Sequence, residues 1–173
     1  MHSVELRPCQ LQDLQELHKI AIRSYNDHYL YLWLDGGAWY VDRSFNKQTL
    51  LDELKDPHAA FYFVYSGAEL VGFLKLNLHK ALENYTAEEA LELERIYLLK
   101  SASGKGIGRE VVRFTKAVAA QYNKRIIWLK AMDSSRSVDF YEQNGFVKCG
   151  THTLPFEQMK PAYRGMFVMK LEL

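Results

Sequence analysis

Three glycines and two basic side chains near the middle of the chain are of types that could hold a phosphate group. Residues 103–109 read Ser-Gly-Lys-Gly-Ile-Gly-Arg. Glycine lets a backbone turn tightly and brings its N–H groups close to a ligand. A helix that begins behind such a loop adds unpaired N–H donors and about half a positive charge. This stretch therefore favours an anion-binding loop, although a glycine-rich turn without a ligand also fits it.

The segments on either side of this loop predict a strand before it and a helix after it. Residues 91–99 show a strand-like alternation of apolar and polar side chains. After the loop, apolar and small residues recur at steps of three and four, which predicts one buried helix face: Ile107, Val111, Thr115, Val118, Ala119 and Tyr122. A strand, a glycine loop and a helix in this order form a phosphate cradle.

Two common phosphate-binding fingerprints do not fit the loop. The dinucleotide pattern needs its third glycine at position 109, where the chain has Arg109. The Walker pattern needs Ser or Thr directly after Gly104-Lys105, where the chain has Gly106. Both of these nucleotide-binding classes are therefore excluded.

The loop resembles motif A of the GCN5-related N-acetyltransferases (GNAT), an Arg/Gln-x-x-Gly-x-Gly/Ala pattern that holds the pyrophosphate of acetyl-CoA. Ser103 stands where the family has Arg or Gln, and Lys105 and Arg109 can supply positive charge instead. Downstream, residues 134–146 are similar to the family's Asn-x-x-Ala-x-x-Phe-Tyr-x-x-x-Gly-Phe, with Ser134 in place of the Asn. Because both motifs occur in the family's order, the resemblance covers nearly the whole chain.

This resemblance implies acetyl-CoA as co-substrate and a set of residues that bind it. The loop backbone would hold the diphosphate, and Ser134 or Ser135 would contact the pantetheine arm. The strand backbone before the loop would stabilise the oxygen that gains charge during acetyl transfer. The implied set is Ile96, Tyr97, Leu98, Ser103, Gly104, Lys105, Gly106, Ile107, Gly108, Arg109, Ser134 and Ser135.

Glu92 and Glu94 are candidate bases on the strand before the loop. Side chains two residues apart in a strand point to the same face. An alkylammonium has a pKa of about 10.4, so near pH 7 only about one amine in a few thousand is neutral, and a base or a water relay must take the proton. Glu94 matches the catalytic glutamate of the family's polyamine acetyltransferases, which implies Glu94 as base and Glu92 as a helper. An exposed polar strand face is the alternative.

The leaving thiolate needs a proton, and Tyr141 is the implied donor. Thiols titrate near 8.5 and phenols near 10, so a tyrosine can donate at modest cost. Tyr141 stands at the tyrosine position of the family's second motif; a helix tyrosine packed against the sheet is the alternative. No metal ion is expected, because the six histidines and two distant cysteines do not show metal-ligand spacing.

The expected acetyl acceptor is a primary amine, a polyamine or another small amine. The Leu-Glu-Arg-Ile-Tyr core at residues 93–97 is similar to bacterial spermidine/spermine acetyltransferases of the PaiA type. Together with the two glutamates, Asp27 and Asp35 would form an anionic pocket, walled by the aromatic residues of 25–40. Packing between two helices is the alternative role for these aromatics.

Two other functions stay open at this stage. One is acetylation of a protein N-terminus or lysine, as in enzymes that modify ribosomal proteins, which would need an open groove. The other is an inactive acetyl-CoA-binding sensor, which the departures at Ser103 and Ser134 favour and the presence of Glu94 and Tyr141 opposes.

Composition limits the partners and the compartment. The 173 residues suit a single domain over residues 1–173, and 48% hydrophobic and 25% charged residues are ordinary for a globular protein. A net charge of +1 gives no overall attraction to nucleic acid or to an anionic membrane. Two cysteines suggest no disulfide framework, and neither a signal segment nor a membrane-spanning run is seen, so a cytoplasmic protein is expected. A homodimer that pairs through residues 164–173 is a further expectation from the family.

The implied fold is α/β, of the α+β type: the GNAT fold, a mixed, mostly antiparallel central sheet of about seven strands flanked by about four helices. The predicted strands cover residues 3–7, 61–65, 69–78, 91–99, 125–131, 146–154 and 164–173. The predicted helices cover residues 10–24, 45–54, 107–122 and 134–144. Residues 25–40 are expected to be irregular, and residues 80–89 form a loop.

Overall fold

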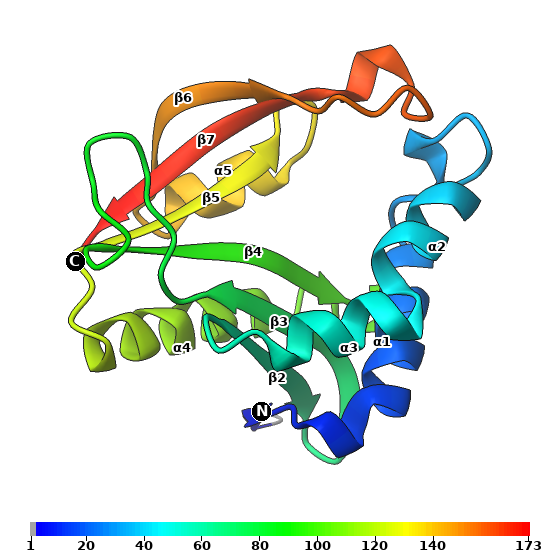
Figure 1. The fold of residues 1–173 in the computed structure, drawn as a ribbon, viewed down its shortest axis with the longest axis horizontal. Helices are drawn as coiled ribbons and strands as arrows, with labels where there is room; N and C mark the ends of the chain where they lie inside the picture. Colours follow the sequence, from blue (N-terminus) through cyan, green and yellow to red (C-terminus); the bar gives the residue numbers. More distant parts are fainter. Residues whose placement is uncertain (1–2) are drawn as a thin grey trace.

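A computed structural model describes residues 3–173 and places them around one seven-stranded sheet (Figure 1). Met1 and His2, the start of the segment in which no signal sequence is expected, lie outside the described residues. The strand order is β1-β2-β3-β4-β5-β7-β6, and β4–β5 is the parallel pair in an otherwise antiparallel sheet. The strands are β1 Val4–Pro8, β2 Ala59–Ser66, β3 Glu69–Asn77, β4 Ala90–Leu98, β5 Ile126–Met132, β6 Val147–Thr153 and β7 Gly165–Glu172. The mixed, mostly antiparallel sheet is confirmed.

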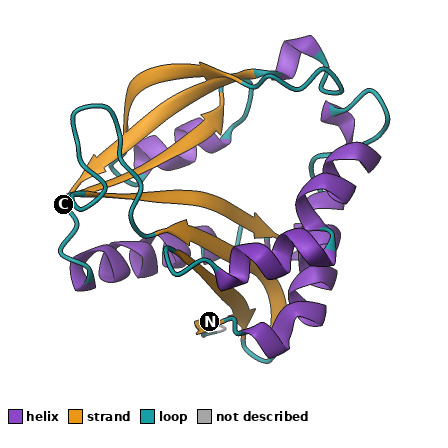
Figure 2. Cartoon of the chain, in the orientation of Figure 1, coloured by secondary structure: helices purple, strands orange, loops and turns teal. Residues whose placement is uncertain are grey.

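Within residues 3–173, five α-helices cover the two faces of this sheet (Figure 2). They are α1 Leu14–Asn26, α2 Ala38–Phe45, α3 Lys47–Lys55, α4 Ile107–Gln121 and α5 Ser137–Gln143. Helices α4 and α5 pack on one face around a core that includes Leu91 and Ile127. Helices α1 to α3 pack on the other face around an aromatic core that includes Phe45 and Phe73.

The helix that the sequence did not predict is α2, inside the aromatic segment expected to be irregular. The carboxylate of Asp35 accepts hydrogen bonds from the N–H groups of Gly37 and Trp39, at 2.9 and 2.7 Å, and so caps the first turn. Asn46 then separates α2 from α3, because its side chain accepts the N–H of Thr49 at 2.8 Å and starts the next helix. Phe45, expected to begin the second helix, therefore ends α2 instead.

The first third of β4 pairs with β5, and the rest does not. The parallel ladder joins Ala90–Glu92 to Ile126–Trp128 and then stops, and the two strands diverge from there in Figure 1. The strands therefore splay from residue 93 onward. The backbone of Ile96 to Leu98, which the resemblance implies for stabilising the acetyl oxygen, has no β5 partner.

A β-bulge in β4 lies at the start of this splay. Arg95 pairs with Lys75 and Leu93 pairs with Leu76, so Glu94 is the extra residue. The bulge shifts the side-chain alternation: Leu91 and Leu93 face the α4 side before it, and Ile96 and Leu98 face that side after it. Glu92, Glu94, Arg95 and Tyr97 consequently all face the side of α1 to α3.

The structure does not support the expected dimer contact through the C-terminal strand. Strand β7 is paired on both edges, with β5 and with β6. A strand whose two edges are already hydrogen-bonded cannot add a third partner in the sheet. An edge-to-edge dimer would have to use β6, the free edge at this end of the sheet.

The described part of the chain shows neither a membrane-spanning helix nor a metal-binding cluster. No helix there is both long and apolar enough to cross a membrane. Residues 3–173 also contain no cluster of three or more His, Cys, Asp or Glu side chains that would hold a metal ion.

Candidate active site

A cavity of about 460 Å³ opens where β4 and β5 separate, and it brings together part of the predicted site. Its walls come from α1, the 29–40 segment, the end of β3, β4, β5, the start of α5, and the 154–166 segment. Of the predicted residues, the lining includes Glu92, Glu94, Ile96, Tyr97, Ser135 and Tyr141. Leu98, Ser134 and the glycine loop lie outside it.

The two carboxylates on β4 share one amide that the sequence did not single out. The Nδ2 group of Asn77, at the end of β3, donates to Glu92 Oε2 at 2.7 Å and to Glu94 Oε2 at 2.8 Å. Because β3 and β4 are adjacent, Asn77 lies opposite Glu92 in the ladder. The amide holds both carboxylates in fixed positions at the cavity wall.

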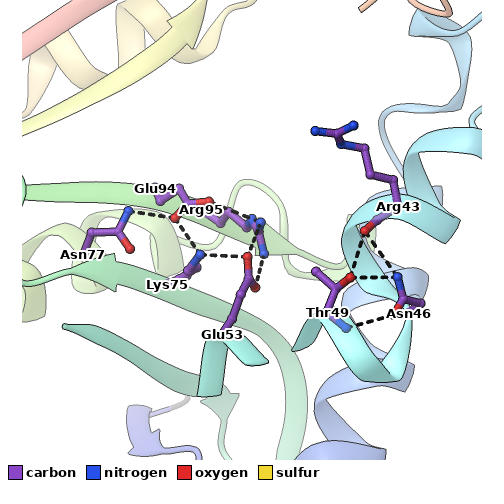
Figure 3. Close-up of polar contacts among 8 residues, drawn as sticks. All are labelled: Arg43, Asn46, Thr49, Glu53, Lys75, Asn77, Glu94 and Arg95. Carbon is purple, nitrogen blue, oxygen red and sulfur yellow. Dashed lines mark hydrogen bonds and ion pairs between the residues drawn. The ribbon is translucent and has the colours of Figure 1, made fainter. Parts of the chain in front are cut away.

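Glu94 belongs to a compact ionic network (Figure 3). Lys75 Nζ lies 2.7 Å from Glu94 and 2.9 Å from Glu53 of α3, and Arg95 donates two hydrogen bonds to Glu53 at 2.9 and 3.0 Å. Arg95 also lies 3.2 Å from Glu94. Burial alone would raise the pKa of Glu94, but the charges of Arg95 and Lys75 and the hydrogen bonds from Lys75 and Asn77 outweigh it and lower the pKa.

Glu92 has a different environment, although it is only two residues away. The residue is 7% exposed, and Asn77 is the side chain that hydrogen-bonds it. Burial raises the pKa of Glu92 above its ordinary value, the Asn77 hydrogen bond partly opposes this, and the negative charge of Glu94 adds to it. A carboxylate with a raised pKa is the better proton acceptor near neutral pH. The environments thus favour Glu92 as the base, whereas the resemblance assigned Glu94.

Tyr141 reaches the cavity from α5, on the opposite wall. Its ring packs between Phe140 and Phe146, with centroid distances of 5.1 and 5.5 Å. Burial raises the pKa of the phenol well above its ordinary value. Tyr141 therefore stays protonated and keeps an O–H group available to donate.

The glycine loop presents free N–H groups at the start of α4. Gly104 and Gly106 have φ values of +74° and +77°, which an L side chain rarely adopts. Within residues 3–173, none of the N–H groups of residues 104–108 donates to a backbone carbonyl. A Cβ placed on either glycine would meet nothing within 4 Å, so the space over the loop is open. This is the geometry of an anion-binding helix N-terminus.

Gly108 of the glycine loop packs against Phe140 of the second sequence motif. A Cβ at this position would lie 3.1 Å from Cζ of Phe140, on the second motif. A larger residue at 108 would push α5, and with it Tyr141, away from the start of α4. Lys105 and Arg109 are exposed beside the loop, as an anion site requires.

Ser135 and Ser134 are placed differently. Ser135 lines the cavity, and its Oγ accepts the N–H of Ser137 at 3.1 Å at the start of α5. Ser134 is exposed and does not line the cavity. Of the two serines proposed for the pantetheine arm, the cavity lining therefore favours Ser135.

The expected anionic pocket is not formed by all four predicted acids. Asp27 accepts the N–H of Lys100 at 2.8 Å and holds the turn after β4, and Asp35 caps α2. Neither residue lines the cavity. The expectation for these two side chains was wrong, because backbone N–H groups satisfy them: that of Lys100 on a distant segment for Asp27, and those of Gly37 and Trp39 nearby for Asp35. The aromatic wall is confirmed in part: Tyr25, Tyr29, Trp33 and Tyr40 line the cavity and also pack against one another.

Two loops meet at the far end of the cavity and form a bridge, here called the roof (residues 30–34 and 156–160). The N–H of Leu34 donates to the carbonyl of Gln158 at 2.9 Å, and the N–H of Lys160 donates to the carbonyl of Leu32, also at 2.9 Å. The ring of Trp33 packs beside that of Phe156, with centroids 6.1 Å apart. Figure 1 shows these two segments side by side beyond α2. The roof limits the size of what can occupy this end.

Residues 14–146 match the acetyltransferase (GNAT) family, and the chain belongs to this family. An uncharacterised N-acetyltransferase from Lactobacillus delbrueckii subsp. lactis, encoded in the pepI 3' region, is 28% identical over 116 residues, covering 66% of this chain and 67% of the relative.

Two of the solved structures that resemble the fold belong to acetyltransferases. The PaiA N-acetyltransferase from Thermoplasma acidophilum, in complex with coenzyme A, has a TM-score of 0.76 at 20% identity and covers 99% of both chains. A chimera of the spermidine N-acetyltransferase SpeG from Vibrio cholerae and hSSAT has a TM-score of 0.72 at 21% identity, covering 98% of this chain and 95% of the chimera. The expected GNAT fold is thereby confirmed.

The family uses acetyl-CoA, and the loop geometry fits that ligand. Five consecutive free N–H groups at a helix start suit a diphosphate. The cavity is lined by Tyr141 of α5, and α5 packs through Phe140 against Gly108 at the start of α4. When bound, acetyl-CoA supplies the acetyl group as a thioester.

Gly106→Ala is expected to weaken coenzyme A binding by about tenfold, because an L side chain disfavours a left-handed backbone by about 1–2 kcal/mol and the loop must shift its N–H groups to relieve this. Isothermal titration with coenzyme A measures the change. Gly36→Ala is a matched control, since Gly36 has a φ of +72° and open space around it but lies outside the loop. Equal losses of affinity in both variants would show that the loop backbone does not hold the ligand.

Proposed function

We propose that this chain transfers the acetyl group of acetyl-CoA to a primary amine of a small molecule held in the cavity. One observation carries the proposal: Glu92, Glu94 and Tyr141 line a single cavity where β4 leaves β5. A base on one wall and a hydroxyl donor on the other are what amine acylation by a thioester requires.

In the proposed reaction, Glu92 takes a proton from the substrate ammonium and passes it to solvent. The neutral amine nitrogen then bonds to the acetyl carbon and loses its second proton to solvent. The sulfur–carbon bond then breaks, and the electron pair leaves with the sulfur. Among residues 96–98, the backbone N–H groups that point to the unpaired edge of β4 stabilise the acetyl oxygen. Tyr141 donates its proton to the sulfur and regains one from solvent. Glu94 stays ionised, and its charge favours the protonated form of Glu92.

Tyr141→Phe is expected to lower kcat by about 10²-fold, the lower end of general acid catalysis, because a thiolate also leaves without full protonation. Coenzyme A affinity should change little, since the ring and its packing remain. Rates of thiol release and titration with coenzyme A separate the two effects. Tyr163→Phe, on a tyrosine outside the cavity lining, serves as the control. An unchanged kcat would remove Tyr141 as the acid.

The roof favours a small acceptor over a folded protein. A protein N-terminus or lysine would have to pass beneath two backbone hydrogen bonds and the Trp33–Phe156 contact. A small amine needs no such opening. The PaiA and SpeG neighbours bring a polyamine forward as one candidate acceptor, and the PaiA-like core at residues 93–97 points the same way.

An acceptor panel tests the proposed function. Purified protein with acetyl-CoA is assayed for thiol release with spermidine, spermine, lysine and an N-terminal peptide. Release with small amines is expected. Release with the peptide alone would favour the protein-modifying alternative, and no release with any amine would favour an acetyl-CoA-binding sensor.

The proposal also covers the compartment, the partners and the oligomeric state of the protein. We place the protein in the cytoplasm, which its two free cysteines, Cys9 and Cys149, support. Small-molecule amines are its proposed partners, without nucleic acid, membrane or metal. A homodimer is proposed through the edge of β6, and size-exclusion chromatography with light scattering measures it.

A further inference from the structure

The charges that line the cavity do not suit a polycation. Among the described residues, the carboxylates of the lining are Glu92 and Glu94. The cations of the lining are Lys80, Lys130 and Arg95, of which Arg95 is paired with Glu53 and Glu94. A polyamine would add two or more further positive charges to this surface. Like charges brought together in a partly closed cavity repel one another.

The ionic network removes one of the two carboxylates from substrate recognition. Glu53, Lys75, Glu94 and Arg95 comprise two anions and two cations, each paired within the group at 2.7 to 3.2 Å (Figure 3). The side chains of Lys75 and Arg95 are 7% and 10% exposed, so solvent screens them little. Because the network is neutral as a unit, Glu94 has little net attraction left for a substrate cation.

Glu92 therefore faces the substrate with two exposed lysines around it. Lys130 follows two residues after Trp128, which pairs with Glu92 in the β4–β5 ladder, so Lys130 shares the face that Glu92 occupies. Lys80 is fixed nearby, because the Nε1 group of Trp128 donates to its carbonyl at 2.9 Å. The charges of both lysines act on Glu92 and oppose the rise in its pKa.

We infer that the acceptor is an amine that also carries an acid group, with the amine against Glu92 and the acid group between Lys80 and Lys130. One carboxylate beside two cations matches a substrate with one positive and one negative end, such as an amino acid. This inference rests on the proposed function and narrows its substrate class. A carboxylate or a phosphonate meets the same requirement, because lysine binds either anion as a point charge.

The test compares substrates that differ only in the acid group. Each common amino acid is assayed against its carboxamide, and ω-amino acids of two to six carbons are assayed against the diamines of equal length, by thiol release with acetyl-CoA. For at least one pair, kcat/KM for the acid-bearing amine should exceed kcat/KM for the matched substrate without the acid group by about tenfold. The difference should arise from a lower KM of the acid-bearing amine.

Charge reversal at one lysine then assigns the preference to the cavity. Lys130→Glu should abolish or invert the preference for the acid-bearing amine, measured as the ratio of kcat/KM within each substrate pair, because any effect of the charge reversal on Glu92 is common to both substrates of a pair. Lys47→Glu is the matched control, because Lys47 is exposed at the start of α3 and does not line the cavity. The Lys130→Glu variant is expected to fold, because the Lys130 side chain is exposed.

The outcomes separate the two proposals. Thiol release that favours diamines or carboxamides, or a preference that Lys130→Glu leaves unchanged, overturns this inference and leaves the acetyltransferase proposal standing. No release with any amine of either panel overturns the acetyltransferase proposal, and the inference with it.

Discussion

Glu92→Gln is expected to lower kcat by about 10³-fold without loss of stability. Glutamine has nearly the shape of glutamate and keeps a hydrogen-bonding partner for Asn77, but it cannot accept the proton of the attacking amine. General base catalysis contributes about 10²- to 10⁴-fold in enzymes. The loss should lie in the upper half of this range, because the substrate amine is almost fully protonated at pH 7 and cannot react until it loses a proton. Steady-state kinetics by thiol release measure the loss.

The stability of this variant follows from the direction of the pKa shift. The pKa of Glu92 is raised in the folded state, so the fold binds this proton more tightly than the unfolded chain does. Its stabilising contribution is fully present below the unfolded pKa and is lost as the pH rises through the folded pKa. At neutral pH the ionised Glu92 lowers the free energy of unfolding. The Glu92→Gln variant should therefore have the same or a higher midpoint of urea denaturation.

The pH profile of kcat/KM distinguishes the two carboxylates. The wild-type profile should lose activity on its acid side at a pH above the ordinary pKa of glutamate, about 4.3, and Glu92→Gln should lack this limb. Glu94→Gln is the control: it should keep the limb but unfold more easily, because Lys75 and Arg95 lose an anion. If the limb vanished in Glu94→Gln and persisted in Glu92→Gln, Glu94 would be the base, as the resemblance implies.

Short-range patterns were enough to predict most of the fold. The helix that became α4 repeats its buried positions at steps of three and four, and Val111, Thr115, Val118 and Ala119 are buried as expected. Tyr122, predicted on the same face, is exposed, because the helix ends at Gln121. The glycine loop was also predictable, since a turn with positive φ at Gly104 and Gly106 is a local property of the backbone.

The unequal environments of Glu92 and Glu94 could not be predicted from β4 alone. A period of two places both side chains on one face, which the structure confirms. Their difference comes from Arg95, which the bulge in β4 turns to the same side as Glu94, and from Lys75 on β3, which lies far away in the sequence. One signal was present: Lys75 is a lone charge in the apolar stretch of β3, and a charge in a buried strand needs a partner.

The bulge also had a sequence signal that strict alternation hides. Leu91 and Leu93 are two residues apart, but the next apolar residue of that face, Ile96, comes after three. The extra residue moves Arg95 to the same side as Glu94, where Arg95 reaches Glu53 and Glu94 reaches Lys75. Without the bulge, Arg95 would point into the α4 core, and the network could not close.

Glu53→Gln is expected to lower the free energy of unfolding by about 3 kcal/mol, because it leaves two nearly buried cations, Lys75 and Arg95, to share the single anion Glu94. For a chain of this length, that corresponds to a fall in Tm of about 6–12 °C. Urea denaturation and calorimetry measure both quantities. Asp52→Asn is the matched control on the same helix, since Asp52 is exposed and accepts one hydrogen bond, from Gln48; it should cost less than about 0.5 kcal/mol.

A double variant shows whether the loss arises from the network. Adding Lys75→Met to Glu53→Gln removes a cation together with its anion, so the double variant should be destabilised by less than the sum of the two single changes, by about 1 kcal/mol or more. Additive losses would mean that the two side chains act independently. A Glu53→Gln variant no less stable than Asp52→Asn would show that solvent screens the network, and Glu94 would then be free to attract a substrate cation. The charges that line the cavity would then no longer favour an acid-bearing acceptor over a polyamine.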